Sequence, residues 1–314
     1  MGNSIPLITV LGTTAVGKTT FAVRLAAALD TEIISADSRQ VFKGMDIGTG
    51  KDLNEYWVNN RLIPTHLIDI AEPGSEYNVF QFQHDFGSAY SVIISKGKIP
   101  ILCGGTGLYI ESVLSGYQMA EGPINEILRQ KLAQLTDDEL IVKLSSLRTL
   151  HNSTDTLNRE RLVRAIEIGV YKKENTIQKP DFDLRDSPVF GIRFDRKTVR
   201  NRITERLVQR LNEGMVEEVQ QLMENRISVD QLKLYGLEYK YVAMFLVGEL
   251  KKSEMFDLLN TAIHQFSKRQ MTWFRRMEKN GIKINWLEGE DGMEINLHKV
   301  LKHIDQLDAT YKSI

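Results

Sequence analysis

Short apolar runs alternate with segments of helical periodicity up to residue 117, and the same alternation returns at residue 188. Apolar β-branched runs predict buried strands, whereas apolar residues at every third or fourth position predict amphipathic helices. The predicted strands are residues 5–11, 32–35, 62–70, 99–103, 188–194 and 282–287. The predicted helices are residues 20–29, 77–95, 108–114, 197–225, 230–247, 253–280 and 293–309. This alternation predicts an α/β fold, in which helices cover both faces of a parallel sheet.

Residues 118–187 depart from this alternation. Their pattern predicts helices at 124–135, 137–147 and 158–173, and no strand. We therefore predict an all-helical insertion at 118–187, within a core that is formed by residues 1–117 and 188–314.

The composition indicates an intracellular globular protein. Of the 314 residues, 42% are hydrophobic, and Cys103 is the single cysteine, which excludes an internal disulfide or a cysteine-cluster metal site. The first residues lack the pattern of a signal peptide, and no window is apolar over the length of a membrane helix. We expect a cytoplasmic protein that does not associate with membranes and is a monomer.

The charge is unevenly distributed although the formal net charge is only −1. Residues 193–283 contain 18 lysines and arginines against 12 acidic residues. Such an excess is consistent with a polyanionic partner, but solvated helix faces often have the same composition.

The strongest motif lies between the first predicted strand and the first predicted helix. Its sequence is Gly12-Thr13-Thr14-Ala15-Val16-Gly17-Lys18-Thr19, which matches the phosphate-binding loop of the P-loop NTPases. Glycines let the backbone amides of such a loop point inward at an anion, and the helix start adds positive partial charge. Lys18 can then reach the outer phosphate, and the Thr19 hydroxyl can bind Mg²⁺. The motif does not identify which phosphate compound binds, although nucleotides are the usual ligands of such loops.

Two other segments follow predicted strands. Asp37 follows residues 32–35, so it lies near the phosphate crevice, where it is either a general base or metal ligand or only the cap of a turn. The segment Gly104-Gly105-Thr106-Gly107 follows residues 99–103 and opens a helix. It lets a second backbone segment and a hydroxyl approach the anion, and the alternative is a tight turn that only needs glycine.

Together with their neighbours, these motifs resemble the bacterial tRNA dimethylallyltransferases. The resemblance covers most of residues 6–287, and the long motif at 37–51 is its most specific part. The segments that carry it are the phosphate-binding loop and residues 37–51, 66–70, 104–109, 161–167, 212–219 and 267–275.

The resemblance implies transfer of a dimethylallyl group from dimethylallyl pyrophosphate to N6 of the adenine that follows the tRNA anticodon. Asp37 is then the general base, and Thr106 hydrogen-bonds near the scissile oxygen. The departing pyrophosphate is stabilised by cationic groups and by the loop. These groups are Lys18, Mg²⁺ at Thr19, Arg129, and an arginine of the 202–206 turn, Arg202 or Arg206.

The resemblance also implies contacts with the anticodon stem-loop. The adenine leaves its stack and enters the site, as is usual for chemistry on a base. The implied tRNA-binding residues are Asp37, Ser38, Arg39, Gln40, Glu160, Arg161, Leu162, Val163 and Arg164. Arg39 and Arg164 also have a simpler interpretation as members of surface ion pairs.

Three other functions are alternatives. A P-loop small-molecule kinase would share the outline of the first 110 residues, and turnover of ATP would favour it. An adenylate isopentenyltransferase would perform the same chemistry on a free nucleotide. A non-catalytic RNA-binding module would not need Lys18, Thr19 and Asp37.

Overall fold

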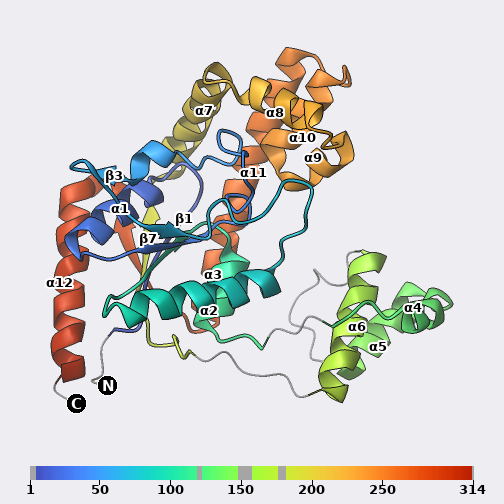
Figure 1. Cartoon of the computed structure of the whole chain (residues 1–314), viewed down its shortest axis with the longest axis horizontal. Helices are drawn as coiled ribbons and strands as arrows, with labels where there is room; N and C mark the ends of the chain where they lie inside the picture. The colour runs from blue at the N-terminus through green and yellow to red at the C-terminus, as the bar shows by residue number, and fades with distance from the viewer. Residues whose placement is uncertain (1–4, 119–121, 148–157, 176–181, 313–314) are drawn as a thin grey trace. The chain divides into compact units, whose positions relative to one another are not determined.

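The computed structural model describes residues 5–118, 122–147, 158–175 and 182–312 (Figure 1). The chain divides into two compact units, one of residues 1–115 and 182–314 and the other of residues 116–181. The sequence places these boundaries at 118 and 187. The return to the core comes earlier because Leu184 is buried and the ring of Phe182 contacts that of Phe86, at 5.2 Å between centroids. Residues 119–121, 148–157 and 176–181 of the predicted insertion lie outside the described residues.

A six-stranded sheet forms the centre of the large unit, with strand order β5-β2-β6-β1-β7-β8. All of its strand pairs are parallel. Its strands are β1 (Ile8–Gly12), β2 (Ile33–Ala36), β5 (Thr65–His66), β6 (Ile101–Gly104), β7 (Val189–Arg193) and β8 (Ile284–Glu288). Because β1, β2 and β6 are neighbours and parallel, the loops after their carboxyl ends meet at one edge of the sheet.

Helices cover both faces of this sheet, as the alternation predicts. Helices α1 (Lys18–Ala28) and α12 (Met293–Lys312) pack on one face, where Ile8 and Val10 point. Helices α2 (Val79–Ser95), α3 (Gly107–Leu114) and α11 (Lys252–Lys279) pack on the other face. The predicted P-loop type of α/β fold is confirmed.

Two predicted helices are each broken by a glycine. The predicted helix 197–225 is α7 (Arg196–Asn212) and α8 (Met215–Glu224), because Gly214 between them has a φ of 103°. The predicted helix 230–247 is α9 (Val229–Tyr235) and α10 (Leu237–Leu246), and Gly236 has a φ of 149°. Such angles are open to glycine and interrupt the helical hydrogen-bond ladder. Helices α7, α8, α10 and α11 share a third core with Val41, Phe42 and Met45.

The predicted strand 62–70, which Pro64 interrupts, forms only in part. Arg61–Leu62 is β4, which pairs in antiparallel fashion with β3 (Trp57–Val58) after a short 3₁₀ helix at Leu53–Tyr56. Only Thr65–His66 joins the main sheet, as β5. Pro64 has no N–H to donate, and Leu67 and Asp69 have left-handed backbones with φ of 63° and 55°.

The small unit is helical in its described residues. It contains α4 (Glu126–Ala133), α5 (Asp137–Leu147) and α6 (Arg159–Glu174). Leucine and isoleucine side chains from these helices form its own core, with Leu132, Leu140, Leu144, Leu162 and Ile166 fully buried. Within the described parts of both units, no helix is long and apolar enough to span a membrane.

Candidate functional site

The phosphate-binding loop turns sharply between β1 and α1. Ala15 and Gly17 have left-handed backbones, with φ of 64° and 79°, and these reverse the chain before α1 begins at Lys18. A Cβ at Gly12 would lie 2.6 Å from Val16 Cγ2, so the buried Val16 needs a glycine beneath it. The predicted strand–loop–helix context of the motif is therefore present.

A glutamine of α11 joins this loop to the second glycine turn. The amide of Thr14 donates to Gln270 Oε1 at 2.9 Å, and Gln270 Nε2 donates to the Gly105 carbonyl oxygen at 2.9 Å. A Cβ at Gly105 would lie 2.5 Å from Gln270 Nε2 and 3.5 Å from Lys18 Cε. The glycine turn thus lies directly against the loop lysine, as its ligand-binding interpretation requires.

Asp37 and Thr106 lie together at the ends of β2 and β6. Asp37 Oδ1 accepts a 3.0 Å hydrogen bond from the Arg39 amide, so the aspartate does cap its own turn. Thr106 Oγ1 accepts a 3.0 Å hydrogen bond from the Ser38 amide, which ties the two strand ends to each other. The cap leaves the chemical role open, because a carboxylate has two oxygens and more than one acceptor position.

The charges of the loop act on one another. Burial lowers the pKa of Lys18, whereas the nearby Asp37 carboxylate raises it and so limits the decrease. Asp37 and Lys18 are therefore within electrostatic reach of each other. Burial raises the pKa of the Cys103 thiol to about 12, so this cysteine is not a thiolate at neutral pH.

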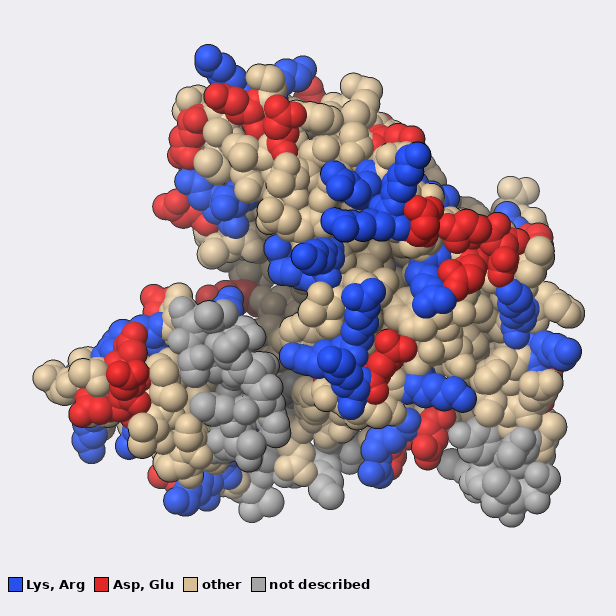
Figure 2. Space-filling view, turned by 180° about the vertical axis from the view of Figure 1, so that it is seen from behind, with Lys and Arg blue, Asp and Glu red and all other residues tan. Residues whose placement is uncertain are grey.

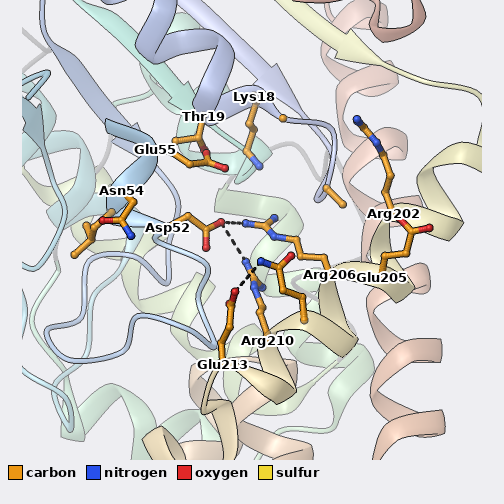
Figure 3. Close-up of a pocket in the computed structure, with 14 residues that line it drawn as sticks. Lys18, Thr19, Asp52, Asn54, Glu55, Arg202, Glu205, Arg206, Arg210 and Glu213 are labelled. Atoms are coloured by element: carbon orange, nitrogen blue, oxygen red, sulfur yellow. Dashed lines mark hydrogen bonds and ion pairs between the residues drawn. The ribbon is translucent and has the colours of Figure 1, made fainter. Parts of the chain in front are cut away.

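A cavity of about 570 Å³ opens beside the loop (Figure 3). Loop residues, the 3₁₀ helix and α7 provide its walls. The lining residues are Ala15, Gly17, Lys18, Thr19, Asp52, Leu53, Asn54, Glu55, Arg202, Glu205, Arg206, Gln209, Arg210 and Glu213.

Three arginines of α7 line this cavity, and their side chains do not all point the same way. Arg202 and Arg206 lie about one helical turn apart on α7, within the helix that the sequence predicts at 197–225. Arg206 forms an ion pair with Asp52, and Arg210 lies 3.7 Å from the same carboxylate. In Figure 3 Arg202 points away from this pair, and its guanidinium stacks on Phe194 with its carbon 4.2 Å from the ring centroid. Of the two predicted arginines, Arg206 thus points into the same part of the cavity as Lys18. Arg210 was missed, although the spacing 202, 206, 210 places all three on one helix face.

The cavity also contains oxygen ligands suited to a hard cation. Glu55 Oε2 accepts a 3.1 Å hydrogen bond from Thr20 Oγ1, and Thr19 lines the same wall. Burial and the neighbouring Asp52 raise the pKa of Glu55. No group of three or more His, Cys, Asp or Glu side chains in the described ranges is arranged around a metal position.

A buried lysine organises the long motif at 37–51. Lys51 is completely buried, and its Nζ donates to the Phe42 carbonyl oxygen and to Asp46 Oδ1, both at 2.6 Å, and to Asp69 Oδ1. These contacts fold the segment around one cation and fix the chain just before Asp52.

A glutamate of α8 holds the same segment from outside. Glu218 accepts hydrogen bonds from the amides of Asp46, Ile47 and Gly48 at 2.7–3.0 Å. It also accepts one from Tyr239 Oη at 2.7 Å. The segments 37–51 and 212–219 are therefore two sides of one structural contact.

We expect Lys51→Met to destabilise the protein more than Lys43→Met. Removing the buried ammonium leaves Asp46 and Asp69 without their shared partner, and the free energy of unfolding should fall by about 2–3 kcal/mol. Lys43 is the matched control, because it lies in the same motif but pairs with Glu72 at the exposed surface. Urea denaturation of both variants measures the difference, and equal midpoints would refute the organising role of Lys51.

The predicted tRNA-binding residues near Asp37 are engaged within the large unit. Arg39 Nη1 forms a 2.8 Å ion pair with Glu238, and its guanidinium carbon lies 4.7 Å from the Phe266 ring centroid. Gln40 is buried and donates to the Gly50 carbonyl oxygen at 3.0 Å. Arg39 therefore does form an ion pair, although this pair is largely buried and not at the surface as the simpler interpretation expects. RNA contact by Arg39 or Gln40 stays a prediction.

The predicted tRNA-binding residues of the insertion differ in exposure. Glu160 and Arg161 are exposed on α6 and Val163 is partly buried, whereas the Leu162 side chain packs in the core of the unit and is not presented at the surface. Arg164 donates to the Gly122 carbonyl oxygen at 2.7 Å and pairs with Glu167 at 3.2 Å. It lines a hollow of about 360 Å³ with Arg161 and Lys172.

Arg129, predicted to bind pyrophosphate, is paired within the insertion. Its guanidinium donates to both carboxylate oxygens of the buried Glu167, at 2.9 and 3.0 Å. A two-point contact of this kind is the strong form of an ion pair. The role of Arg129 at the pyrophosphate stays a prediction.

Basic side chains gather on part of the surface (Figure 2). Helix α11 contributes several exposed basic side chains, namely Lys268, Arg269, Arg275 and Lys279. The same helix carries Gln270 on its buried side, so one element reaches from the basic surface to the phosphate-binding loop.

Comparison with known proteins gives consistent matches. The family described as IPP transferase matches residues 40–277, and the one described as isopentenyl transferase matches residues 5–66. The chain is 52% identical to tRNA dimethylallyltransferase 2 of Bacteroides fragilis over 300 residues, which are 96% of this chain and 98% of the relative. It is 54% identical to tRNA dimethylallyltransferase 1 of Azobacteroides pseudotrichonymphae over 285 residues, 90% of this chain and 92% of the relative.

Solved structures show the same fold. A tRNA isopentenylpyrophosphate transferase from Staphylococcus epidermidis has a TM-score of 0.67 and 30% identity, and the match covers 96% of this chain and 98% of that one. A eukaryotic dimethylallyltransferase acting on tRNA has a TM-score of 0.71 at 21% identity, with 90% of this chain and 73% of that one covered.

Proposed function

Because the chain belongs to the IPP transferase family of tRNA dimethylallyltransferases, we propose that it uses dimethylallyl pyrophosphate to modify N6 of the adenine that follows the tRNA anticodon. The membership confirms the family that the motifs resemble, and makes the protein a prenyltransferase. The observation that supports the donor is the cavity at the phosphate-binding loop, where Lys18 and Arg206 face one another. Cations on both sides of a cavity suit a pyrophosphate.

In the proposed reaction one bond forms and one breaks at the same carbon. The adenine N6 forms a bond to C1 of the dimethylallyl group, while the C1–O bond breaks and its electron pair leaves with the pyrophosphate. Lys18 and Arg206 stabilise the charge that develops on the leaving oxygen. Asp37 accepts the proton that N6 loses, and Thr106 holds the Asp37–Ser38 turn in place through the Ser38 amide.

We propose that Mg²⁺ binds beside the loop, held by the Thr19 hydroxyl and the Glu55 carboxylate. Hydroxyl and carboxylate oxygens are the ligands that Mg²⁺ prefers, and both line the cavity. The ion would neutralise pyrophosphate charge and so make it a better leaving group.

The direct test mixes the protein, Mg²⁺, labelled dimethylallyl pyrophosphate and bulk unmodified tRNA, and then measures label in the RNA. We expect label at the adenine next to the anticodon, without any requirement for ATP. Parallel reactions with free AMP as acceptor, and with ATP and no isoprenoid, test the adenylate isopentenyltransferase and the kinase. Label in AMP but not in tRNA, or ATP turnover alone, would refute the proposed function.

We propose that the exposed face of α6 contacts the anticodon stem-loop. Arg161→Ala should flatten the dependence of log affinity on log salt by about 0.7–0.9 units if one phosphate contact is lost. Arg164→Ala should do the same. Binding of the isoprenoid pyrophosphate alone should not change.

Filter binding over a range of salt concentrations measures these slopes. Lys143→Ala is the matched control, since it removes one exposed cation from another helix of the same unit. Arg161 gives the cleaner test, because Arg164 also donates to the Gly122 carbonyl oxygen. Unaltered affinity and slope in both arginine variants would leave them as ordinary surface residues.

A further inference from the structure

Arg210 is a buried cation beside the phosphate-binding loop. Only 8% of it is exposed, yet it lines the same cavity as Lys18 and Thr19. Within the described residues, its Nε atom has no hydrogen-bond partner. A buried guanidinium with an unpaired N–H is costly, so a stable protein retains one most readily where a ligand completes it.

The carboxylates around Arg210 are already used by other arginines. Asp52 pairs closely with Arg206 and lies 3.7 Å from Arg210. A second carboxylate that acts on Arg210 is Glu238, which forms its 2.8 Å ion pair with Arg39. Each of these two carboxylates therefore lies closer to another arginine than to Arg210, or forms its ion pair with another arginine.

The chain is shaped to let Arg210 reach the cavity. A Cβ at Gly50 would overlap the guanidinium of Arg210, and Gly50 has a φ of +67°. Asp52, two residues later, has a left-handed backbone with a φ of 43°, which is uncommon for a residue with a side chain. The backbone at both positions is therefore left-handed beside the Arg210 side chain.

We propose that Arg210 binds the pyrophosphate group together with Arg206, and that Asp52 is the internal anion that the pyrophosphate replaces. The proposal rests on the proposed function, because it takes the occupant of the cavity to be pyrophosphate. A phosphate oxygen between the two arginines supplies the charge that one shared carboxylate cannot, and arginine forks suit phosphate oxygens. Asp52 is then an autoinhibitory contact, which holds both arginines apart from the ligand until the ligand competes.

Titration of the full-length protein with inorganic pyrophosphate and Mg²⁺ by calorimetry tests this directly. Arg210→Gln should raise the Kd about tenfold or more, because a charge-assisted hydrogen bond is lost. The Kd of Arg210→Lys should fall between those of the wild-type protein and Arg210→Gln, since lysine restores the charge without the two-pronged guanidinium. Asp52→Asn should lower the Kd about threefold to fivefold, because it removes the competing carboxylate.

The lower Kd expected for Asp52→Asn is the decisive result. If Asp52 and Arg210 only anchored the loop, breaking their contact would leave pyrophosphate binding unchanged or weaker. When Asp52→Asn is combined with Arg210→Gln, it should lower the Kd by a smaller factor, because one of the two arginines that Asp52 contacts is gone. Arg196→Gln is the matched control, because it removes an exposed charge of α7 that does not line the cavity.

The outcomes separate this inference from the proposed function. Wild-type Kd in Arg210→Gln, or no gain in Asp52→Asn, overturns the inference, and Asp52→Asn decides alone if Arg210→Gln does not fold. Loss of binding in Lys18→Ala beside normal binding in Arg210→Gln overturns only the inference. No pyrophosphate binding by the wild-type protein overturns both.

Discussion

Asp37→Asn should fold, bind tRNA within a few-fold of the parent, and lose about 10²–10⁴-fold of its single-turnover rate. A general base contributes a factor of this order to a chemical step. The asparagine keeps an acceptor for the Arg39 amide, so the turn at the end of β2 should persist. It cannot take a proton from the adenine amine.

Rapid-mixing transfer with enzyme in excess over tRNA measures this rate, beside tRNA affinity and thermal denaturation of the same variant. Thr106→Ser is the control, since its hydroxyl can still accept from the Ser38 amide and should preserve most of the rate. A near-normal rate in Asp37→Asn would leave Asp37 as a turn cap and remove it from the mechanism.

Lys18→Ala should nearly abolish pyrophosphate binding and reduce transfer by about 10²–10³-fold. Lys18 lies against the Gly105 turn and is buried, so little water surrounds its ammonium group. When the ammonium group is removed, water therefore cannot compensate for the lost positive charge. Arg206 and Arg210 belong to α7, on another wall of the cavity, so they cannot take the position of the Lys18 ammonium.

Calorimetry with pyrophosphate and multiple-turnover transfer check the Lys18 prediction, with Lys96→Ala as a lysine control at the opposite end of the sheet. Lys96 pairs with Glu32 and does not line the cavity. Unimpaired transfer by Lys18→Ala, or a need for ATP hydrolysis, would show that the loop holds a different ligand.

The sheet and most helices could be predicted because each depends on local pattern. Apolar runs gave the strands β1, β2, β6, β7 and β8 within three residues at either end. Two of the errors lie where one residue overrides the pattern: Gly214 and Gly236 end helices whose apolar spacing continues through them. Both glycines were visible, but their φ angles depend on tertiary packing.

The candidate site was predictable where residues follow parallel strands. The phosphate-binding loop, Asp37 and Thr106 all follow strand ends, so topology alone brings them together. The supporting residues were not predictable, because they act across long sequence separations. Gln270 contacts Thr14 across 256 residues, and Glu218 contacts Asp46 across 172. Neither partner can be read from local spacing.

The contact between Thr14 and Gln270 also sets the time at which the site can form during translation. The central strand β1 is made first, but its neighbour β7 follows only after the insertion, and Gln270 later still. The growing chain therefore carries a phosphate-binding loop without its clamp through most of its synthesis, since domains acquire long-range contacts only after both partners exist. A ribosome-bound chain that is stalled before residue 270 therefore has a phosphate-binding loop that Gln270 does not yet connect to the Gly105 turn.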